Sequence, residues 1–267
     1  MGVTLPKVDA AQLASFYPPT YGTYEQLPAG VLGFISKAVQ RLQSWQSLRT
    51  APLERLAKQP PGRLLDVGCG RGDLGSWFVR RGWSVVGVEP SAQACAVARG
   101  RGVDARHGTL ADVSLEPETY DAVVFRQSLE HVSDPVDDLR RAREALRCAG
   151  VVIVSVPNFG GWQSRRFGGC WFHLDLPRHR HHFNANALHT VLTQAGFGQV
   201  ETCTSSSSLG LPASVQYALI GHCLFPEGLK LRGAAALCAA TTPFTRLLDR
   251  LAGAGDVLHA VAYPERG

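Results

Sequence analysis

Apolar residues follow two patterns along the chain, one typical of strands and one typical of helices, and these patterns alternate from about residue 62 onward. The runs Leu64–Val67 and Val151–Val156 are apolar at most positions, which is typical of parallel strands buried on both faces. Leu74, Trp77 and Phe78 instead recur at helical spacing. We therefore expect an α/β fold with helices on both faces of a seven-stranded sheet, mostly parallel with an antiparallel last strand.

The boundaries of these elements are also visible in the sequence. Ser91, Asp134 and Asn184 stand where a helix N-cap is expected, Pro135 fits the first helical position, and Gly196 fits the end of a helix. The expected strands are 64–67, 84–89, 103–107, one within 118–125, 151–156, 199–204 and 256–263.

The same patterns divide the chain into four segments. We expect residues 1–61 to form a helical cover that includes a helix from Val31 to Leu48, and residues 62–204 to form the core of the α/β fold. Residues 205–255 predict an apolar helical insertion that caps the core, and residues 256–267 supply the final strand.

The stretch 202–226 carries no formal charge. A membrane-spanning helix needs about 20 mainly apolar residues, whereas four consecutive serines, Pro212, Gln216 and His222 interrupt this one. We expect the region 205–250 to cap the substrate pocket or to rest on a bilayer surface as peripheral helices do.

A glycine-rich turn follows the first core strand. Gly68, Gly70 and Gly72 allow the backbone to bend and to approach a ligand closely. Strand, glycine turn and helix together hold nucleotide-like ligands at the carboxyl edge of a sheet. A dinucleotide site would show G-x-G-x-x-G, and the carboxylates of Asp66 and Asp73 would repel a pyrophosphate. The turn therefore favours a ligand with cationic groups and argues against NAD.

The next strand ends in Glu89, 23 residues after Asp66, where a carboxylate can accept both hydroxyls of a ribose. This order resembles the class I S-adenosylmethionine (SAM) dependent methyltransferases, whose first motif is D/E-x-G-x-G-x-G and whose second strand ends in an acid. The resemblance extends from about Gly62 to Gly198 and implies a Rossmann-like fold with SAM as the cofactor.

The resemblance also implies a set of cofactor contacts. The family places an acid after the third strand, but Thr109 or Leu110 takes that position here and Asp112 is displaced, so we expect an apolar and backbone contact to adenine. The expected cofactor-binding residues are Tyr21, Asp66, Gly68, Cys69, Gly70, Gly72, Glu89, Pro90, Thr109, Leu110 and Gln127.

Two further motifs carry histidines. Tyr120–Val132 resembles the F-D-x-V…L-E-H-V signature of the ubiquinone-pathway O-methyltransferases, and Leu174–Phe183 resembles L-D-x-P-R-H-x-x-H-F in related methyltransferases, where it lines the substrate side. A histidine near neutral pKa suits the removal of a proton from an oxygen nucleophile. We therefore expect His131, His179 and His182 to be catalytic.

The sequence offers two candidate metal sites, one in the histidine-rich stretch and one in the strand-four segment. Cys170, His173, His179 and His182 contain zinc-ligand types without a spacing that requires zinc. Some ubiquinone-pathway relatives bind magnesium in the strand-four segment, but Gln127 stands here where a further carboxylate is expected. We assign no metal.

Composition limits the remaining alternatives. The chain has 267 residues, 45% of them hydrophobic and 18% charged, and a net charge of +5, which does not by itself indicate nucleic acid. The seven cysteines are scattered and the N-terminus lacks a signal peptide, so we expect a cytoplasmic protein.

The favoured function is methyl transfer to a small-molecule or lipid-linked acceptor, most simply at oxygen. A non-catalytic SAM-fold module and a nucleic-acid methyltransferase are the alternatives, although residues 127–130 lack the N/D-P-P-Y/F motif of the latter.

Overall fold

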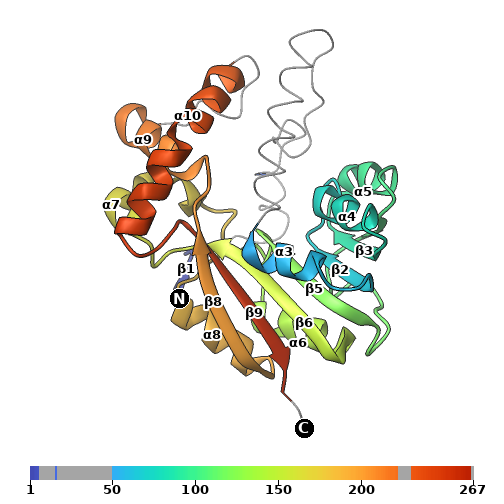
Figure 1. Cartoon of the computed structure of the whole chain (residues 1–267). Coiled ribbons are helices and arrows are strands. Elements are labelled where there is room, and N and C mark those ends of the chain that lie inside the picture. The colour runs from blue at the N-terminus through green and yellow to red at the C-terminus, as the bar shows by residue number, and fades with distance from the viewer. Residues whose placement is uncertain (6–15, 17–49, 222–229, 266–267) are drawn as a thin grey trace.

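The structure is a computed structural model that describes residues 1–5, 16, 50–221 and 230–265, with the backbone alone from 230 to 240. Its centre is one seven-stranded sheet in the order β4-β3-β2-β5-β6-β9-β8 (Figure 1). The strands are β2 (Arg63–Val67), β3 (Ser84–Glu89), β4 (Asp104–His107), β5 (Tyr120–Arg126), β6 (Leu146–Pro157), β8 (Phe197–Ser205) and β9 (Val257–Pro264).

Only the last strand of this sheet is reversed. β9 runs antiparallel to both of its neighbours, β6 and β8, while the other described pairs are parallel. The expected α/β fold with a mostly parallel sheet and an antiparallel last strand is therefore confirmed.

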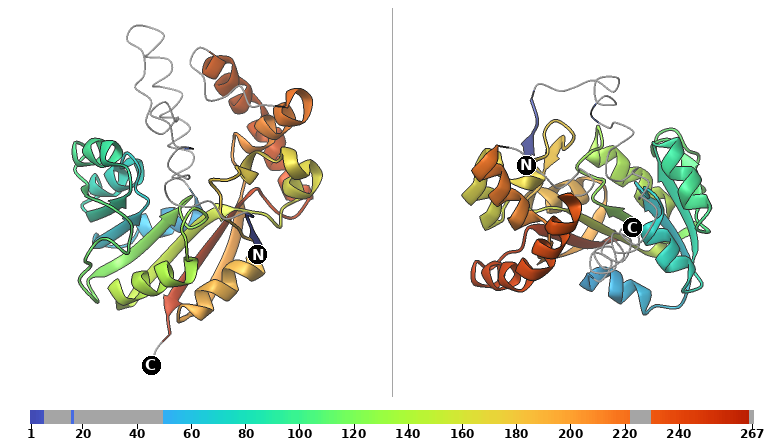
Figure 2. Two further views of the ribbon diagram at one scale, coloured as in Figure 1. Left: turned by 180° about the vertical axis from the view of Figure 1, so that it is seen from behind. Right: turned by 90° about the horizontal axis from the view of Figure 1, so that it is seen from above.

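Helices cover both faces of the sheet, as the two further views show (Figure 2). Leu53 and Leu56 of α3 (Ala51–Ala57) pack in one core with α4 (Asp73–Val79) and α5 (Ala92–Arg99). Leu139 of α6 (Pro135–Ala145) and Leu188 of α8 (Ala185–Gln194) pack in the other core. Burying a leucine side chain contributes about 1.5–3 kcal/mol, so these two apolar layers hold the sheet in place.

The predicted helix caps are present. The Ser91 side chain accepts a hydrogen bond from the Ala94 N–H, the Asp134 side chain accepts from the N–H groups of Val136 and Asp137, and the Asn184 side chain accepts from the Ala187 N–H. Each cap satisfies donors that a first helical turn leaves without a partner, which fixes where these helices begin.

One boundary prediction was wrong. The fifth strand was expected at Val151–Val156, but β6 begins at Leu146. Leu146 pairs with Tyr120, and the register then shifts before Ala122 pairs with Val151. Because the extra residues form a bulge rather than a separate turn, the strand starts earlier than its apolar run.

The remaining elements lie beyond the carboxyl edge of the sheet. A short strand β1 (Gly2–Val3) pairs antiparallel with β7 (His181–His182). Three short helices follow β6 and two longer ones join β8 to β9: α7 (Trp162–Phe167), η1 (Gly168–Cys170), η2 (Phe172–Leu174), α9 (Gly210–Ile220) and α10 (Lys230–Leu251). Within the described residues, no helix combines the length and apolarity needed to cross a bilayer.

Two predictions fall outside the described residues. The helix expected at Val31–Leu48 and the cofactor contact expected at Tyr21 both lie there.

Candidate active site

The glycine turn between β2 and α4 is tightly folded. The N–H groups of Gly68 and Cys69 both donate to the Val88 carbonyl, at 2.8 and 3.1 Å. Gly68, Gly70 and Gly72 all have positive φ, between 53° and 75°, a region that other residues enter at a cost. A Cβ on Gly68 would lie 2.5 Å from the Cβ of Ser128. The turn is therefore pressed against the loop that follows β5.

Glu89 links the tip of β3 to this turn. Its Oε2 accepts from the Gly70 N–H at 2.9 Å and its Oε1 accepts from the Ser91 N–H at 2.9 Å. Burial raises the pKa of this carboxyl, and the two backbone bonds act in the opposite direction. A carboxylate oxygen can accept a second hydrogen bond, so Glu89 still has acceptor capacity for a pair of hydroxyls.

Asp66 offers a buried acceptor at the end of β2. Its side chain is 2% exposed, and burial raises its pKa to about 7, with Arg126 acting in the opposite direction. Among the described residues, its Oδ2 has no hydrogen-bond partner. Leaving a buried acceptor unmatched costs free energy, so a ligand with a donor group would suit this site. Asp66, Glu89 and the glycine turn together fit SAM.

In the loop after β4, the displaced acid Asp112 binds the backbone and side chain of Thr109. Asp112 Oδ2 accepts from the Thr109 N–H at 2.8 Å and from the Thr109 hydroxyl at 2.7 Å. These bonds lower the pKa of Asp112. Leu110 is 2% exposed and packs in the core, whereas Thr109 and Pro90 are exposed. Of the residues expected on the adenine side, Thr109 and Pro90 therefore have accessible surface and Leu110 has almost none.

Two other expected cofactor contacts lie beside the turn. Cys69 is 6% exposed, and burial raises the pKa of its thiol, which makes it unreactive. Gln127 follows β5 with φ at 53° and donates its N–H to the Ser155 carbonyl at 2.8 Å. A positive φ at a residue other than glycine is uncommon, and here it directs the chain into the loop that carries Ser128 and Glu130.

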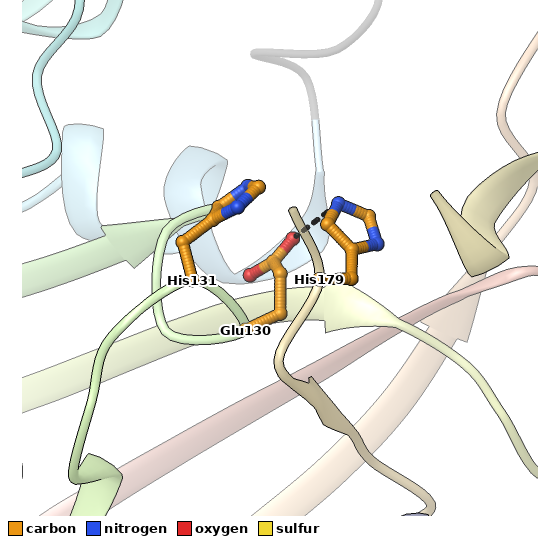
Figure 3. A group of neighbouring side chains, drawn as sticks. All are labelled: Glu130, His131 and His179. Carbon is orange, nitrogen blue, oxygen red and sulfur yellow. Dashed lines mark ion pairs between the residues drawn. The ribbon is translucent and has the colours of Figure 1, made fainter. Parts of the chain in front are cut away.

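A carboxylate and two histidines meet beyond this loop (Figure 3). Glu130, His131 and His179 each offer one ligand atom, and these atoms lie within 4.8 Å of one another. Glu130 is fully buried, and neither carboxylate oxygen has a hydrogen-bond partner among the described residues. Its Oε1 lies 4.0 Å from Nε2 of His179. Burial raises the pKa of Glu130 to about 8, so the carboxyl holds a proton at neutral pH.

Both histidines are oriented by backbone carbonyls. Nδ1 of His131 lies 3.0 Å from the Arg178 carbonyl, and Nδ1 of His179 lies 2.8 Å from the His173 carbonyl. A carbonyl only accepts, so each Nδ1 carries the proton and each neutral ring has its lone pair on Nε2. Burial lowers the pKa of both rings. They are therefore neutral at pH 7 and able to accept a proton.

His182 stands in a different environment. It lies on β7, and its Nε2 is 3.1 Å from the Thr4 hydroxyl, which itself donates to the His179 carbonyl at 2.6 Å. Burial lowers the pKa of His182 as well. Of the three histidines expected to be catalytic, the structure brings His131 and His179 together and gives His182 a bond to the N-terminal strand.

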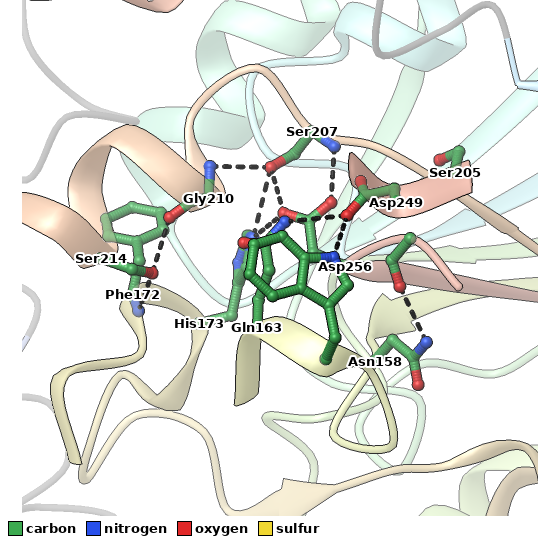
Figure 4. Close-up of polar contacts among 12 residues, drawn as sticks. Asn158, Gln163, Phe172, His173, Ser205, Ser207, Gly210, Ser214, Asp249 and Asp256 are labelled. Atoms are coloured by element: carbon green, nitrogen blue, oxygen red, sulfur yellow. Dashed lines mark hydrogen bonds and ion pairs between the residues drawn. The ribbon is translucent and has the colours of Figure 1, made fainter. Parts of the chain in front are cut away.

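The zinc ligands considered from sequence do not form a group. Nε2 of His173 lies 3.1 Å from Oδ2 of Asp256, in a polar network with Ser207 (Figure 4). Within the described residues, the cluster of potential metal ligands is Glu130, His131 and His179 instead. Carbonyl bonds to Nδ1 also orient histidines that bind metals through Nε2, so this cluster has the composition to hold a divalent cation.

Sequence reasoning missed the contribution of Thr4 and the burial of Glu130. Thr4 lies 175 residues from His179, and no local pattern links the two. The L-E-H-V resemblance did single out Glu130, but only the fold shows that its carboxyl is sealed from water.

A cavity of about 600 Å³ lies elsewhere, between α3 and the first residues of β2 and β5. Its lining includes Leu56, Gly62 and Asp121 and none of the expected site residues. It opens at the amino edge of the parallel strands, whereas ligands of such sheets bind at the carboxyl edge. We therefore place the candidate site at the glycine turn and the histidine cluster.

Comparison with known proteins agrees with this geometry. The sequence model of a methyltransferase domain family matches residues 40–202. A ubiquinone biosynthesis O-methyltransferase of Cereibacter sphaeroides is 30% identical over 151 residues, which cover 52% of this chain and 61% of that protein. One from Azorhizobium caulinodans is 35% identical over 133 residues, covering 48% and 50%. The chain thus matches half to three fifths of the length of these curated relatives.

Solved structures show the same fold. A SAM-dependent methyltransferase of Thermotoga maritima, described as a possible histamine N-methyltransferase, has a TM-score of 0.58 at 19% identity, covering 85% of this chain and 92% of that one. Phosphoethanolamine N-methyltransferase 2 of Haemonchus contortus, solved with SAM, has a TM-score of 0.63 at 18% identity, covering 98% and 61%.

The family match covers more than half of the chain and includes the strand, glycine turn and acidic tip that surround the expected cofactor site. The chain therefore belongs to the methyltransferase domain family.

Proposed function

We propose that this chain transfers a methyl group from SAM to an oxygen atom of a small-molecule or lipid-linked acceptor. The observation that carries the proposal is the pair of neutral, carbonyl-oriented histidines, His131 and His179, around the buried carboxyl of Glu130. A hydroxyl nucleophile must lose its proton during transfer, and a neutral imidazole is a suitable acceptor for it. An amine acceptor would have less need of such a base.

The cofactor is held by the residues around the glycine turn. SAM supplies an electrophilic methyl group that needs no covalent enzyme intermediate. Glu89 would accept the ribose hydroxyls, and Asp66 provides a buried acceptor near the turn. The backbone at Gly68, Gly70 and Gly72 would allow close approach of the cofactor, because these residues have no Cβ.

The acceptor side is formed by the histidine segment. Nε2 of His131 or His179 takes the proton from the acceptor hydroxyl, and burial of the cluster excludes competing water. Glu130 stays protonated beside His179, whose ring packs edge to face against that of His131. His182 acts with Thr4 to position the segment that carries His179. This mechanism requires no metal.

The proposal also assigns the flanking segments. Residues 62–204 hold the cofactor, while the flanking segments contribute described residues that pack inward on the acceptor side, such as Thr4 and Ser214. The described cysteines form no disulfide, which accords with action in the cytoplasm or at the surface of a membrane.

Two variants separate binding from chemistry. Glu89→Ala should abolish binding of S-adenosylhomocysteine in calorimetric titration, with NADH as a negative control, because the ribose loses its acceptor. His131→Ala should bind the same ligand normally and slow transfer to a phenolic acceptor by about 10²-fold or more. Equal loss of binding in both variants would refute the assigned roles.

The nature of the acceptor atom is tested with matched substrates. A catechol and an aniline of similar size should differ, with transfer to the catechol depending on His131 and His179. Transfer to the amine alone would contradict the oxygen assignment while leaving the cofactor site intact.

A further inference from the structure

The described part of α10 has its polarity reversed. From residue 241 to residue 251, the buried side of the helix is mainly polar, and the exposed side carries large apolar side chains together with two arginines. The buried residues are Thr242, Thr245 and Asp249, at 6, 0 and 4% exposure. The exposed residues are Phe244, Leu247 and Leu251, at 57, 53 and 77% exposure. A helix on the surface of a water-soluble domain normally shows the opposite arrangement.

Hydrogen bonds hold α10 in this orientation. Oδ1 of Asp249 accepts from Nε1 of Trp162 at 2.6 Å and from Nε2 of Gln163 at 3.3 Å (Figure 4). The Thr245 hydroxyl donates to the Thr241 carbonyl at 3.1 Å. Turning the apolar side inward would carry Asp249 away from the protein and leave Nε1 of Trp162 and the buried Nε2 of Gln163 without this acceptor. The apolar side is therefore fixed outward.

The neighbouring helix α9 adds to this surface, since α9 and α10 pack together (Figure 1). α9 contains no charged residue, and its last turns expose Val215, Leu219 and Ile220, at 39, 77 and 47%. Single exposed apolar residues are ordinary, whereas several large ones on two helices that pack together indicate a candidate contact surface. We name these six residues of α9 and α10 the apolar face.

Among the residues of α9 and α10 whose side chains are described, the exposed charges are both positive. Arg246 and Arg250 are exposed on α10, next to Leu247 and Leu251. Asp249, the acid on the same part of the helix, points inward to Trp162. Exposed apolar side chains flanked by arginines match a bilayer surface that carries anionic headgroups.

We propose that the apolar face of α9 and α10 docks on a bilayer containing anionic phospholipid. The proposal deepens and rests on the proposed function, because it places a lipid-linked acceptor beside the site. The Ser214 hydroxyl of α9 accepts from the Phe172 N–H at 3.0 Å, and the next residue, His173, supplies the carbonyl that orients His179. The docking surface is thus bonded to the segment that carries the proposed base.

Vesicle sedimentation tests the docking. Wild-type protein should pellet with phosphatidylcholine vesicles that contain about 30% phosphatidylglycerol and much less with phosphatidylcholine alone. The double variant Leu219→Glu/Leu247→Glu should lose about tenfold or more of this binding, because two carboxylates replace the inserted side chains. Leu5→Glu is the matched control, since Leu5 is as exposed as Leu219 at 77% but lies outside both helices. It should bind as wild type does.

A second pair of substitutions tests the charge. Arg246→Glu/Arg250→Glu should lose binding to the anionic vesicles by about tenfold or more and remove most of its salt dependence. Vesicle binding that survives both double variants would overturn the proposal. Failure of the wild-type protein to bind vesicles would also overturn it. A wild-type dimer that becomes a monomer in the Leu219→Glu/Leu247→Glu variant, as measured by light scattering, would overturn it too, because the apolar face would then be an interface between two copies.

Calorimetry separates this proposal from the proposed function. Both double variants should bind S-adenosylhomocysteine and methylate a water-miscible phenol as wild type does, because none of the four residues belongs to the site. Normal binding of S-adenosylhomocysteine without vesicle binding refutes the docking alone. Absence of S-adenosylhomocysteine binding in wild type refutes the cofactor roles whatever the vesicles show.

Discussion

The buried carboxyl of Glu130 predicts an unusual dependence of stability on pH. Its pKa rises from 4.5 to about 8 in the folded protein because the side chain is sealed from water. Each pKa unit corresponds to about 1.36 kcal/mol, so the full effect on the free energy of unfolding is about 5 kcal/mol. Between these pKa values the folded state binds more protons than the unfolded state. The contribution of Glu130 to stability is therefore largest below pH 4.5 and is lost as pH rises toward 8.

Glu130→Gln removes this titration while keeping the shape of the protonated side chain. The variant should become more stable than wild type as pH rises, by about 1.4 kcal/mol per pH unit between the two pKa values. Urea unfolding of both proteins at several pH values from about 5 to 8.5, with a chelator present, measures the difference. Glu116→Gln is the control, because the Glu116 side chain is 79% exposed and should show no such trend.

Parallel stability profiles for wild type and Glu130→Gln would refute the reasoning. They would mean that Glu130 is ionised in the folded protein and that its charge is compensated. The same measurement without chelator then distinguishes the two sources of compensation. A cation in the cluster would stabilise wild type but not the variant, whereas compensation by protein groups would leave the profiles unchanged.

Three further predictions concern the turn, the sheet and the cluster. Gly68→Ala should weaken S-adenosylhomocysteine binding in calorimetry at least tenfold, because φ of Gly68 is +73° and an added Cβ would lie 2.5 Å from the Cβ of Ser128. Gly253→Ala is the control and should bind normally, because Gly253 has a similar φ of +74° but open space around it. Burial lowers the pKa of His259 to about 4, so about 3 kcal/mol of stability should be lost as pH falls from 6.5 to 4, and urea midpoints of His259→Asn should lack this loss. Methyl transfer should persist after dialysis against EDTA, and loss that magnesium or zinc restores would instead assign a metal to Glu130, His131 and His179.

The fold was largely predictable because its signals are local. The apolar runs, the glycine turn and the caps at Ser91, Asp134 and Asn184 each need only a few adjacent residues to be recognised. The start of β6 was not predictable in the same way. Leu146 joins the strand through a shifted pairing with Tyr120, and a register shift is a property of two strands rather than of one sequence run.

The candidate site was predictable in its parts but not in its arrangement. His131 and His179 were both expected to be catalytic, yet 48 positions separate them and no spacing rule joins them. Their meeting depends on the N–H groups of Arg180 and His181, which donate to the Glu130 carbonyl and lay one segment across the other. The burial of the Glu130 carboxyl follows from this crossing, and with it the proton that the carboxyl holds at neutral pH.

The orientation of α10 shows a second limit of sequence patterns. Periodicity identifies an amphipathic helix but does not say which side faces the protein. Here Asp249 decides, because its bonds to Trp162 and Gln163 require the polar side to be buried. A hydrophobic side that folding leaves exposed must be useful elsewhere or it would favour aggregation. The polar contacts that orient α10 therefore also expose its leucines to the proposed bilayer. The hydrogen bond from Phe172 to Ser214 connects this surface with the histidine segment.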